Sequence, residues 1–154
     1  MTDYGASQRI SSIVTLVEGI AIGGDMHVQP GAARHLGAET PLEMLNRPEP
    51  FFPLTQDDGE AIFIAKRQVA YVEQRGGVNN PDPVRASVAR MFPLEVTLVG
   101  GLTLTGVSQS ELPPAHSRTS DFLNMSGEPF FPLQTDTALL YVNRSHVRVA
   151  RSLR

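Results

Sequence analysis

The amino-acid sequence has no cysteine, no excess of positive charge and no long hydrophobic run. Without cysteine, the chain can form no disulfide, no thiolate nucleophile and no cysteine-bound zinc site. A formal charge of −3 and a pI near 5.8 argue against a broad basic surface that binds nucleic acid nonspecifically. The most apolar early run, residues 13–22, is interrupted by Glu18 and Gly19, is too short to span a membrane and shows no signal-peptide pattern. We therefore expect a soluble, cytoplasmic protein without membrane insertion.

What the chain does have is the composition of a folded protein, with 41% hydrophobic and 19% charged residues. Its 154 residues suffice for one ordinary domain or for two small ones.

An internal repeat favours two small units. The hexapeptide EPFFPL occurs twice, at residues 49–54 and 128–133. Three other blocks recur in the same order at an offset of about eighty residues: VTLVEGIAIGG with VTLVGGLTLTG, LN with LN, and AIFIAKRQVAYV with ALLYVNRSHVRVA. Convergent composition could imitate one block, but not all of them in register. The sequence predicts one unit over residues 11–75 and a second over 84–154, joined by a Gly-, Asn- and Pro-rich linker at 76–83.

Each unit has the pattern of five strands. β-Branched and aliphatic residues on either side of a glycine turn predict a hairpin, and Gly100 and Gly101 at the second turn suit positive φ. FFPL supplies a short third strand. AIFIA and QVAYV, or ALLYV and HVRVA, supply a fourth and a fifth strand joined by a tight polar turn. We expect an all-β fold with short helices.

A helical turn or two is expected before each third strand. Thr40, Pro41 and Glu43 form an N-terminal capping pattern, and Asn46 is expected to end the helix in the left-handed conformation. Asp121 occupies the matching position in the second copy.

Two further features of local structure can be predicted. The spacing of Val84, Val88 and Met91 indicates a short helix over residues 84–92, leading into the second unit. Pro53 and Pro132 lack an amide hydrogen, so the third strands should be short, bulged or at an edge, with these prolines facing away from any continuous ladder.

This succession of elements resembles the Sm-like (LSm, Hfq-like) family. VTLVGGLTLTG is similar to the family's first motif, and LLYVNRSHVRV is similar to its second, in which two strands flank a loop. The link before the third strand is longer here by about twenty residues in each copy. The resemblance implies two tandem Sm-like/SH3-like five-stranded small β-barrels. It also implies that edge strands pair between neighbouring units and can close a ring.

The resemblance also implies a place for RNA, because the turns between the fourth and fifth strands would lie at the pore of such a ring. The candidate nucleic-acid-binding residues are Asn46, Lys66, Arg67, Asn124, Arg144 and His146. The basic residues would contact phosphates or bases, and the asparagines would hydrogen-bond to bases. The alternative is that these are ordinary solvated turns and that both asparagines end helices.

No cofactor, metal site or catalytic site is expected. The chain has four histidines, at His27, His35, His116 and His146. Their spacing is not that of a zinc site. The stretch GVSQS at residues 106–110 lacks the second glycine of a nucleophile elbow. We therefore expect that the protein is not an enzyme.

Two functions remain open. The first is a structural or scaffold role through protein–protein contacts, with the long links at residues 25–49 and 107–128 as assembly loops; the acidic balance fits it. The second is a ring that binds single-stranded RNA through the polar turns. In both cases the expected partners include further copies of the chain, in a homo-oligomer or ring, or a larger protein assembly.

Overall fold

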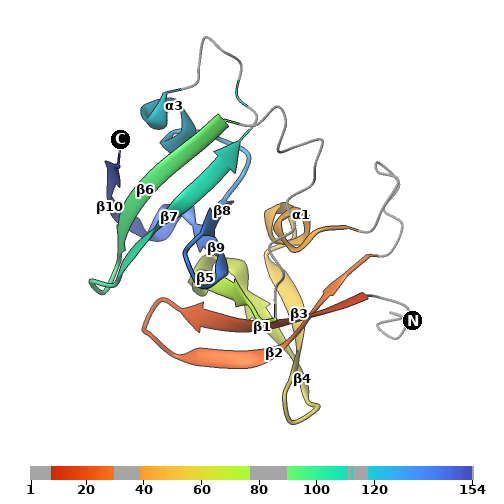
Figure 1. The fold of residues 1–154 in the computed structure, drawn as a ribbon. Coiled ribbons are helices and arrows are strands. Elements are labelled where there is room, and N and C mark those ends of the chain that lie inside the picture. Colours follow the sequence, from red (N-terminus) through yellow and green to blue (C-terminus); the bar gives the residue numbers. More distant parts are fainter. Residues whose placement is uncertain (1–7, 30–38, 77–89, 111, 113–117, 154) are drawn as a thin grey trace.

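The strands of the protein form one ten-stranded antiparallel sheet, shown in Figure 1. The structure is a computed structural model and describes residues 8–29, 39–76, 90–110, 112 and 118–153. The first half contains β1 (Gln8–Leu16), β2 (Ala21–Val28), α1 (Pro41–Asn46), β3 (Phe51–Gln56), β4 (Ala61–Ala65) and β5 (Val69–Gln74). The second half contains β6 (Arg90–Leu98), β7 (Thr103–Ser110), α3 (Thr119–Leu123), β8 (Phe130–Gln134), β9 (Leu139–Asn143) and β10 (Val147–Ser152). A single 3-10 turn joins the last two strands of each half, Lys66–Gln68 in the first and Arg144–His146 in the second. The all-β class with short helices is confirmed.

The two halves use their strands in the same order. The sheet runs β10-β6-β7-β8-β9-β5-β1-β2-β3-β4, so each half places its fifth strand first and its fourth strand last. The register repeats as well, since Val14 faces Ile22 as Val96 faces Leu104. Over the described residues the sheet is open, with β4 at one edge and β10 at the other.

The halves meet where β5 pairs with β9, in the middle of the sheet (Figure 1). We call this contact, with the side chains that cross it, the central junction. Each half has its own core, but the cores share residues: Phe130 and Tyr141 of the second half belong to the first core, and Ala70 of the first half belongs to the second. Burial of apolar surface therefore holds the halves together as well as each half separately.

The expected hairpin turns are present. Gly19 has a φ of 97°, and Gly100 and Gly101 have φ values of 100° and 98°. The prediction that the second turn uses positive φ is confirmed.

The prediction about the prolines of the third strands is also confirmed. Pro53 faces Phe63 of β4, while the pairing of β3 with β2 ends at Leu54. Pro132 likewise faces Tyr141 of β9, and β8 pairs with β7 only through Gln134. Each proline therefore has a ladder on one side only, because it has no amide hydrogen to donate to a second.

A glycine in each second strand lets the third strand approach closely. A Cβ at Gly24 would meet the carbonyl oxygen of Thr55, and a Cβ at Gly106 would meet the carbonyl oxygen of Gln134. Both contacts are to backbone, which cannot rotate away. We expect Gly24→Ala and Gly106→Ala each to lower the free energy of unfolding by about 1–3 kcal/mol, as overpacking does elsewhere, in urea denaturation.

Gly23→Ala is the matched control for this prediction. It is the neighbouring glycine, and its Cβ would meet the carboxylate of Asp57 and the guanidinium of Arg75, the ends of two ion-paired side chains that can move, and no backbone atom. A loss at Gly23 as large as that at Gly24 would show that close approach of the third strand is not the reason for the glycine.

The short helix α1 begins as expected. The Thr40 hydroxyl accepts from the Glu43 amide at 3.1 Å, and the Glu43 carboxylate accepts from the Thr40 amide at 2.9 Å. Its end is different from the prediction, because Asn46 does not take positive φ. Arg47, which precedes a proline and is therefore held extended, ends the helix instead. In α3, Asp121 accepts from the Arg118 amide at 3.1 Å, as its matching position suggested.

The helix predicted over residues 84–92 is wrong at its C-terminal end, where Arg90–Leu98 forms β6. The physical reason is a two-residue period of burial: Phe92, Leu94, Val96 and Leu98 all face the core. Residues 84–89, and the linker from residue 77 onward, lie outside the described residues.

In the part of the chain that the structure describes, no helix combines the length and the apolar character that a bilayer crossing requires.

Candidate functional site

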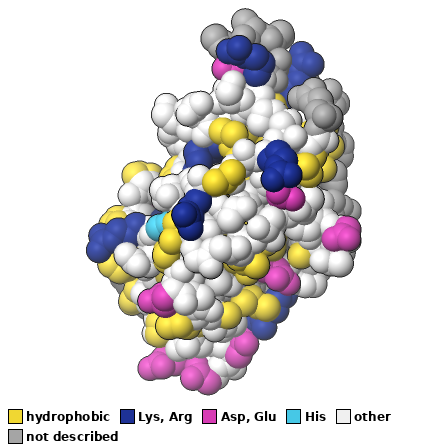
Figure 2. Space-filling view, turned by 90° about the vertical axis from the view of Figure 1, so that its left-hand side faces the viewer, with side chains coloured by type: hydrophobic (Ala, Val, Ile, Leu, Met, Phe, Trp, Pro, Cys, Tyr) yellow, Lys and Arg dark blue, Asp and Glu magenta, His cyan; other side chains and the backbone are white. Residues whose placement is uncertain are grey.

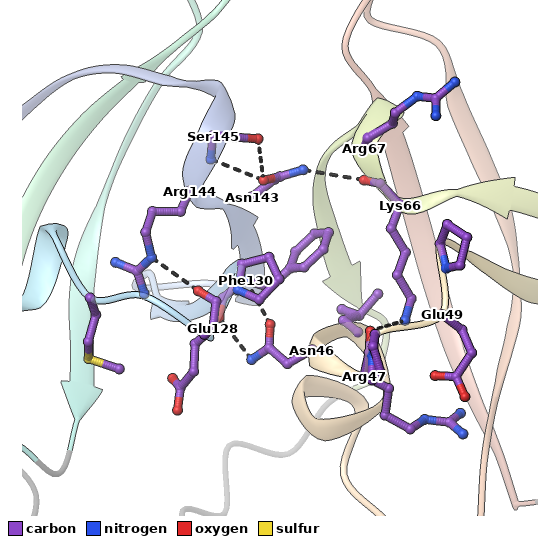
Figure 3. A pocket seen from close by; sticks show the side chains of 16 residues that line it. Asn46, Arg47, Glu49, Lys66, Arg67, Glu128, Phe130, Asn143, Arg144 and Ser145 are labelled. Carbon is purple, nitrogen blue, oxygen red and sulfur yellow. Dashed lines mark hydrogen bonds between the residues drawn. The ribbon is translucent and has the colours of Figure 1, made fainter.

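A pocket of about 830 Å³ lies at the central junction (Figure 3). Equivalent segments of both halves line it: the chain before the third strand and the start of the turn between the fourth and fifth strands. The lining residues are 45–50, 66–67, 125, 127–130 and 143–145. The pocket is thus built by the duplication, since neither half forms it alone.

The candidate nucleic-acid-binding residues divide into three groups. Asn46, Lys66, Arg67 and Arg144 line the pocket. His146 lies beside them, with Nε2 2.6 Å from the carbonyl oxygen of Arg67. Asn124 is not brought to the pocket; its Nδ2 donates to the carbonyl of Ser120 at 2.8 Å, so it ends α3.

The Lys66 side chain forms hydrogen bonds with the backbone at the end of α1. Its Nζ donates to the carbonyl oxygens of Met44, at 3.0 Å, and Arg47, at 2.9 Å, and the residue is buried. Burial, with a smaller contribution from the charge of Arg47, lowers the pKa of Lys66. The ammonium thus gives the carbonyls at the end of the helix a charged donor, in addition to the Arg47 amide, which donates to Met44 at 3.3 Å.

Arg144 has the same place in the second half. Its Nη1 donates to the carbonyl of Phe122 in α3 at 2.8 Å, and its Nε donates to the carbonyl of Glu128 at 3.1 Å. The guanidinium lies 5.1 Å from the ring centroid of Phe122 and 5.0 Å from that of Phe131. Burial lowers the pKa of Arg144, which the carboxylate of Glu128 opposes.

Lys66 and Arg144 are thus equivalent residues that hold the helix of their own half against the turn. In both halves the backbone amide of this cation also donates to the proline that precedes the third strand, Pro50 or Pro129, at 2.8 Å. Their charged groups point into the protein. Arg67, in contrast, is exposed, and its side chain extends away from the pocket (Figure 3).

Asn46 has a role that the sequence did not reveal. Its side-chain amide spans the junction and pairs with the backbone of Phe130: Nδ2 donates to the carbonyl at 3.1 Å, and Oδ1 accepts from the amide at 2.7 Å. Asn46 therefore acts on Phe130 as a neighbouring strand would. We call this pair the asparagine clamp.

Two more polar contacts across the junction were missed. Asn143 donates from Nδ2 to the carbonyls of Val69, at 3.0 Å, and Lys66, at 3.3 Å. The hydroxyl of Tyr141 donates to Gln74 at 2.7 Å, and burial raises the pKa of Tyr141, which keeps it a donor. The signal that could have found these residues is a difference between the copies, because the first copy has alanine and phenylalanine at the same places.

The described residues contain no group of three His, Asp or Glu side chains that could hold a metal ion. His27 is buried and lies 2.8 Å from the hydroxyl of Thr55, and burial lowers its pKa. His35 and His116 lie outside the described residues.

The surface has no broad basic area on the face that Figure 2 presents. Lys and Arg side chains stand apart there among hydrophobic and uncharged ones, and acidic side chains gather at the lower end, where the β3–β4 hairpin lies in Figure 1. The turn of this hairpin carries Asp57, Asp58 and Glu60. The electrostatics of this face thus give little support for nonspecific binding of nucleic acid.

Comparison of the chain with protein families, with curated proteins and with solved structures found no match in any of the three.

Proposed function

We propose that the chain is a non-enzymatic structural or scaffold protein, built from two Sm-like barrel units, that acts through protein–protein contacts at the edges of its sheet. One observation carries the proposal: the chain joins its own halves by pairing β5 with β9, while the equivalent strands, β10 and β4, pair on one side only among the described residues and form the two edges of the sheet.

The exposed side chains of these edges support the proposal. Phe63 on β4 is 63% exposed and Val149 on β10 is 61% exposed. An edge strand with exposed apolar residues is a template for pairing with another chain.

Co-purification from the native source, with a tagged chain, tests the proposal. We expect a stoichiometric protein partner, either an untagged copy or another protein, and we expect it to be lost from the double variant Phe63→Lys, Val149→Lys. Both side chains are exposed, so the variant should fold as the wild type does. A partner that the charged edges retain, or the absence of any protein partner, would contradict the proposal.

RNA binding at the pocket is the second candidate function. It is supported by Asn46, Lys66 and Arg67 lying around one pocket, although Lys66 turns its ammonium inward. It predicts co-purifying material that absorbs at 260 nm, and salt-sensitive binding of single-stranded RNA that Arg67→Ala weakens. Arg9→Ala, which changes an exposed arginine outside the pocket, is the matched control. No binding of mixed oligonucleotides at low salt would rule this candidate out.

A further inference from the structure

We infer that the pocket at the central junction binds a cationic group on an apolar stem, a guanidinium or an ammonium, and holds it between the carboxylates of Glu49 and Glu128. This goes beyond the proposed function, because it concerns the pocket and not the edges of the sheet. Three features of the pocket support it: the repeated glutamate, the hydrogen bonds of the lining side chains and the apolar walls.

The glutamate is the residue of the EPFFPL hexapeptide whose side chain the fold does not use. In both copies the second phenylalanine and the leucine are buried in a core. The first proline accepts a hydrogen bond from the following turn, and the second limits pairing to one side of the strand. Within the described part of the chain, no hydrogen bond or ion pair holds the carboxylate of Glu49 or of Glu128. The sequence therefore repeats a charged residue that neither packing nor strand pairing requires.

The two glutamates come from different halves and line the same pocket. They lie on opposite sides of it, and their side chains extend in the same direction (Figure 3). Glu49 is exposed and Glu128 is half-buried. Like charges at one pocket repel each other, so a cation between them is stabilised by both.

The cations that line the pocket are directed elsewhere. Lys66 and Arg144 donate to backbone carbonyls, and Arg47 forms an ion pair with Glu39 at 3.0 Å. Nη2 of Arg144 has no hydrogen-bond partner among the described residues, but it is buried and exposes almost no surface to a ligand. The side chain of Arg67 extends away from the pocket (Figure 3).

The uncharged donors of the lining are also in use. The side-chain amides of Asn46 and Asn143 donate across the junction, and the hydroxyl of Ser145 donates to Oδ1 of Asn143 at 2.8 Å. The lining prolines have no amide hydrogen to offer. The pocket therefore presents carboxylate acceptors and few donors. Ammonium and guanidinium groups are donors only and match it, whereas a phosphate, which only accepts, does not.

The walls between the carboxylates are largely apolar. Pro48, Pro50, Pro129 and Met125 belong to the lining. The volume of about 830 Å³ lies within the range of about 300–1,000 Å³ that is usual for small-molecule sites. An alkyl stem packs against such walls while its charged end reaches the carboxylates. A free polyamine or alkylguanidine and the lysine or arginine side chain of a protein both have this chemistry.

The carboxylates also act on the buried cation of their own half. Burial lowers the pKa of Lys66 and of Arg144, and the charges of Glu49 and Glu128 oppose this effect. If the carboxylates served only as countercharges, glutamine in their place would lower the stability of the protein, and no ligand would bind. The experiment therefore measures both binding and stability.

Isothermal titration calorimetry of the purified chain at low ionic strength tests the inference, with agmatine as the first probe. Agmatine carries a guanidinium and an ammonium on a short alkyl stem. We expect saturable binding, which Glu49→Gln and Glu128→Gln each weaken about three- to tenfold and the double variant abolishes. Glu18→Gln is the matched control, because it removes the same charge from an exposed residue outside the pocket, and it should leave binding unchanged.

Two model compounds distinguish the sources of the cation. N-acetylarginine methylamide represents an arginine of a protein, and N-acetylcitrulline methylamide has the same shape without the charge. We expect the arginine compound to bind at least about tenfold more tightly than the citrulline compound. Tighter binding of the arginine compound than of agmatine identifies a protein side chain as the ligand, and the reverse order identifies a free polyamine or alkylguanidine.

Arg67→Ala separates a cationic ligand from RNA. This variant removes a positive charge beside the pocket, so it should strengthen agmatine binding about twofold, whereas it should weaken the binding of RNA. Weaker agmatine binding in Arg67→Ala would contradict the inference.

The inference is overturned if neither agmatine nor the arginine compound binds at millimolar concentration, or if the citrulline compound binds equally well. It is also overturned if Glu18→Gln weakens binding as much as the pocket variants do. Losses of stability in urea denaturation without any binding would mean that the carboxylates serve only as countercharges. None of these outcomes decides the proposed function, because co-purification with the variant Phe63→Lys, Val149→Lys tests the edges separately.

Discussion

Replacing Arg144 with methionine lowers the free energy of unfolding by about 3 kcal/mol, and replacing Arg67 with methionine leaves it almost unchanged. The guanidinium of Arg144 donates to the carbonyls of Phe122 and Glu128 and lies over two aromatic rings. A hydrogen bond to a charged group contributes about 1.5–3 kcal/mol, and a cation–π contact about 0.5–2 kcal/mol. The sum is less than additive, because one side chain makes all of these contacts.

Methionine keeps much of the volume of Arg144, so the expected loss reflects the bonds rather than a cavity. The measurement is urea denaturation, with a fall in melting temperature of about 6–12 °C as the corresponding thermal effect for a chain of this size. Arg67 is the matched control, because it lies in the equivalent turn and its side chain is exposed. An equally small effect at both positions would mean that Arg144 is not a structural cation.

Arg144→Lys sharpens this result. Lys66 meets two carbonyls with a single ammonium in the first half. Lysine at position 144 should therefore recover part of the stability that methionine loses. It should not restore the contacts of the guanidinium with the rings of Phe122 and Phe131. A lysine variant no more stable than the methionine variant would show that the ring contacts, and not the helix carbonyls, are what Arg144 supplies.

The elements that could be predicted from the sequence are those whose cause is local. Gly100 and Gly101 predicted their turn because glycine, which has no Cβ, adopts positive φ without steric cost. Thr40 and Glu43 predicted the start of α1 because both residues of the capping box lie within one helical turn. Pro53 marked the end of a ladder because the missing donor belongs to proline. The repeat then carried each of these features to the second half.

The features that could not be predicted depend on partners far apart in the chain. Asn46 was expected to end its helix in the left-handed conformation, but it bonds to Phe130, a residue of the other half. The composition of a polar turn also does not show where its charged side chain points. The Lys66 ammonium donates to carbonyls at the end of α1, and the same sequence would fit a lysine that faces water. The helix expected up to residue 92 failed for a different reason. Residues 90–92 belong to β6, in which every second side chain is buried, and this period belongs to a strand.

For the candidate site, the sequence pointed to the right turns but not to what their side chains do. Four of its six candidates line one pocket because equivalent segments of the two halves meet at the junction. The charged groups of Lys66 and Arg144, however, donate to backbone carbonyls of the protein itself. The structural use of Lys66 and Arg144 becomes visible only when the position of each helix relative to its turn is known.

The asparagine clamp gives the second large expected effect. Asn46→Leu lowers the free energy of unfolding by about 2–4 kcal/mol, because it leaves both the amide and the carbonyl of Phe130 without a partner. Leucine is close to asparagine in size and keeps water from taking its place. The backbone of Phe130 also positions its ring in the core of the first half, so the loss is felt across the junction.

Asn124→Leu is the matched control, since the duplication places Asn124 where Asn46 stands, but the Asn124 side chain is exposed and bonds within its own helix end. It loses only the bond to Ser120 at an exposed helix end and should cost less than about 1 kcal/mol. Both variants are measured by urea denaturation at low protein concentration, where association between chains does not contribute. Similar losses at the two positions would mean that Asn46 matters as the end of a helix. A large loss at Asn46 alone means that one side-chain amide joins the two halves, whereas its counterpart at position 124 bonds within its own half.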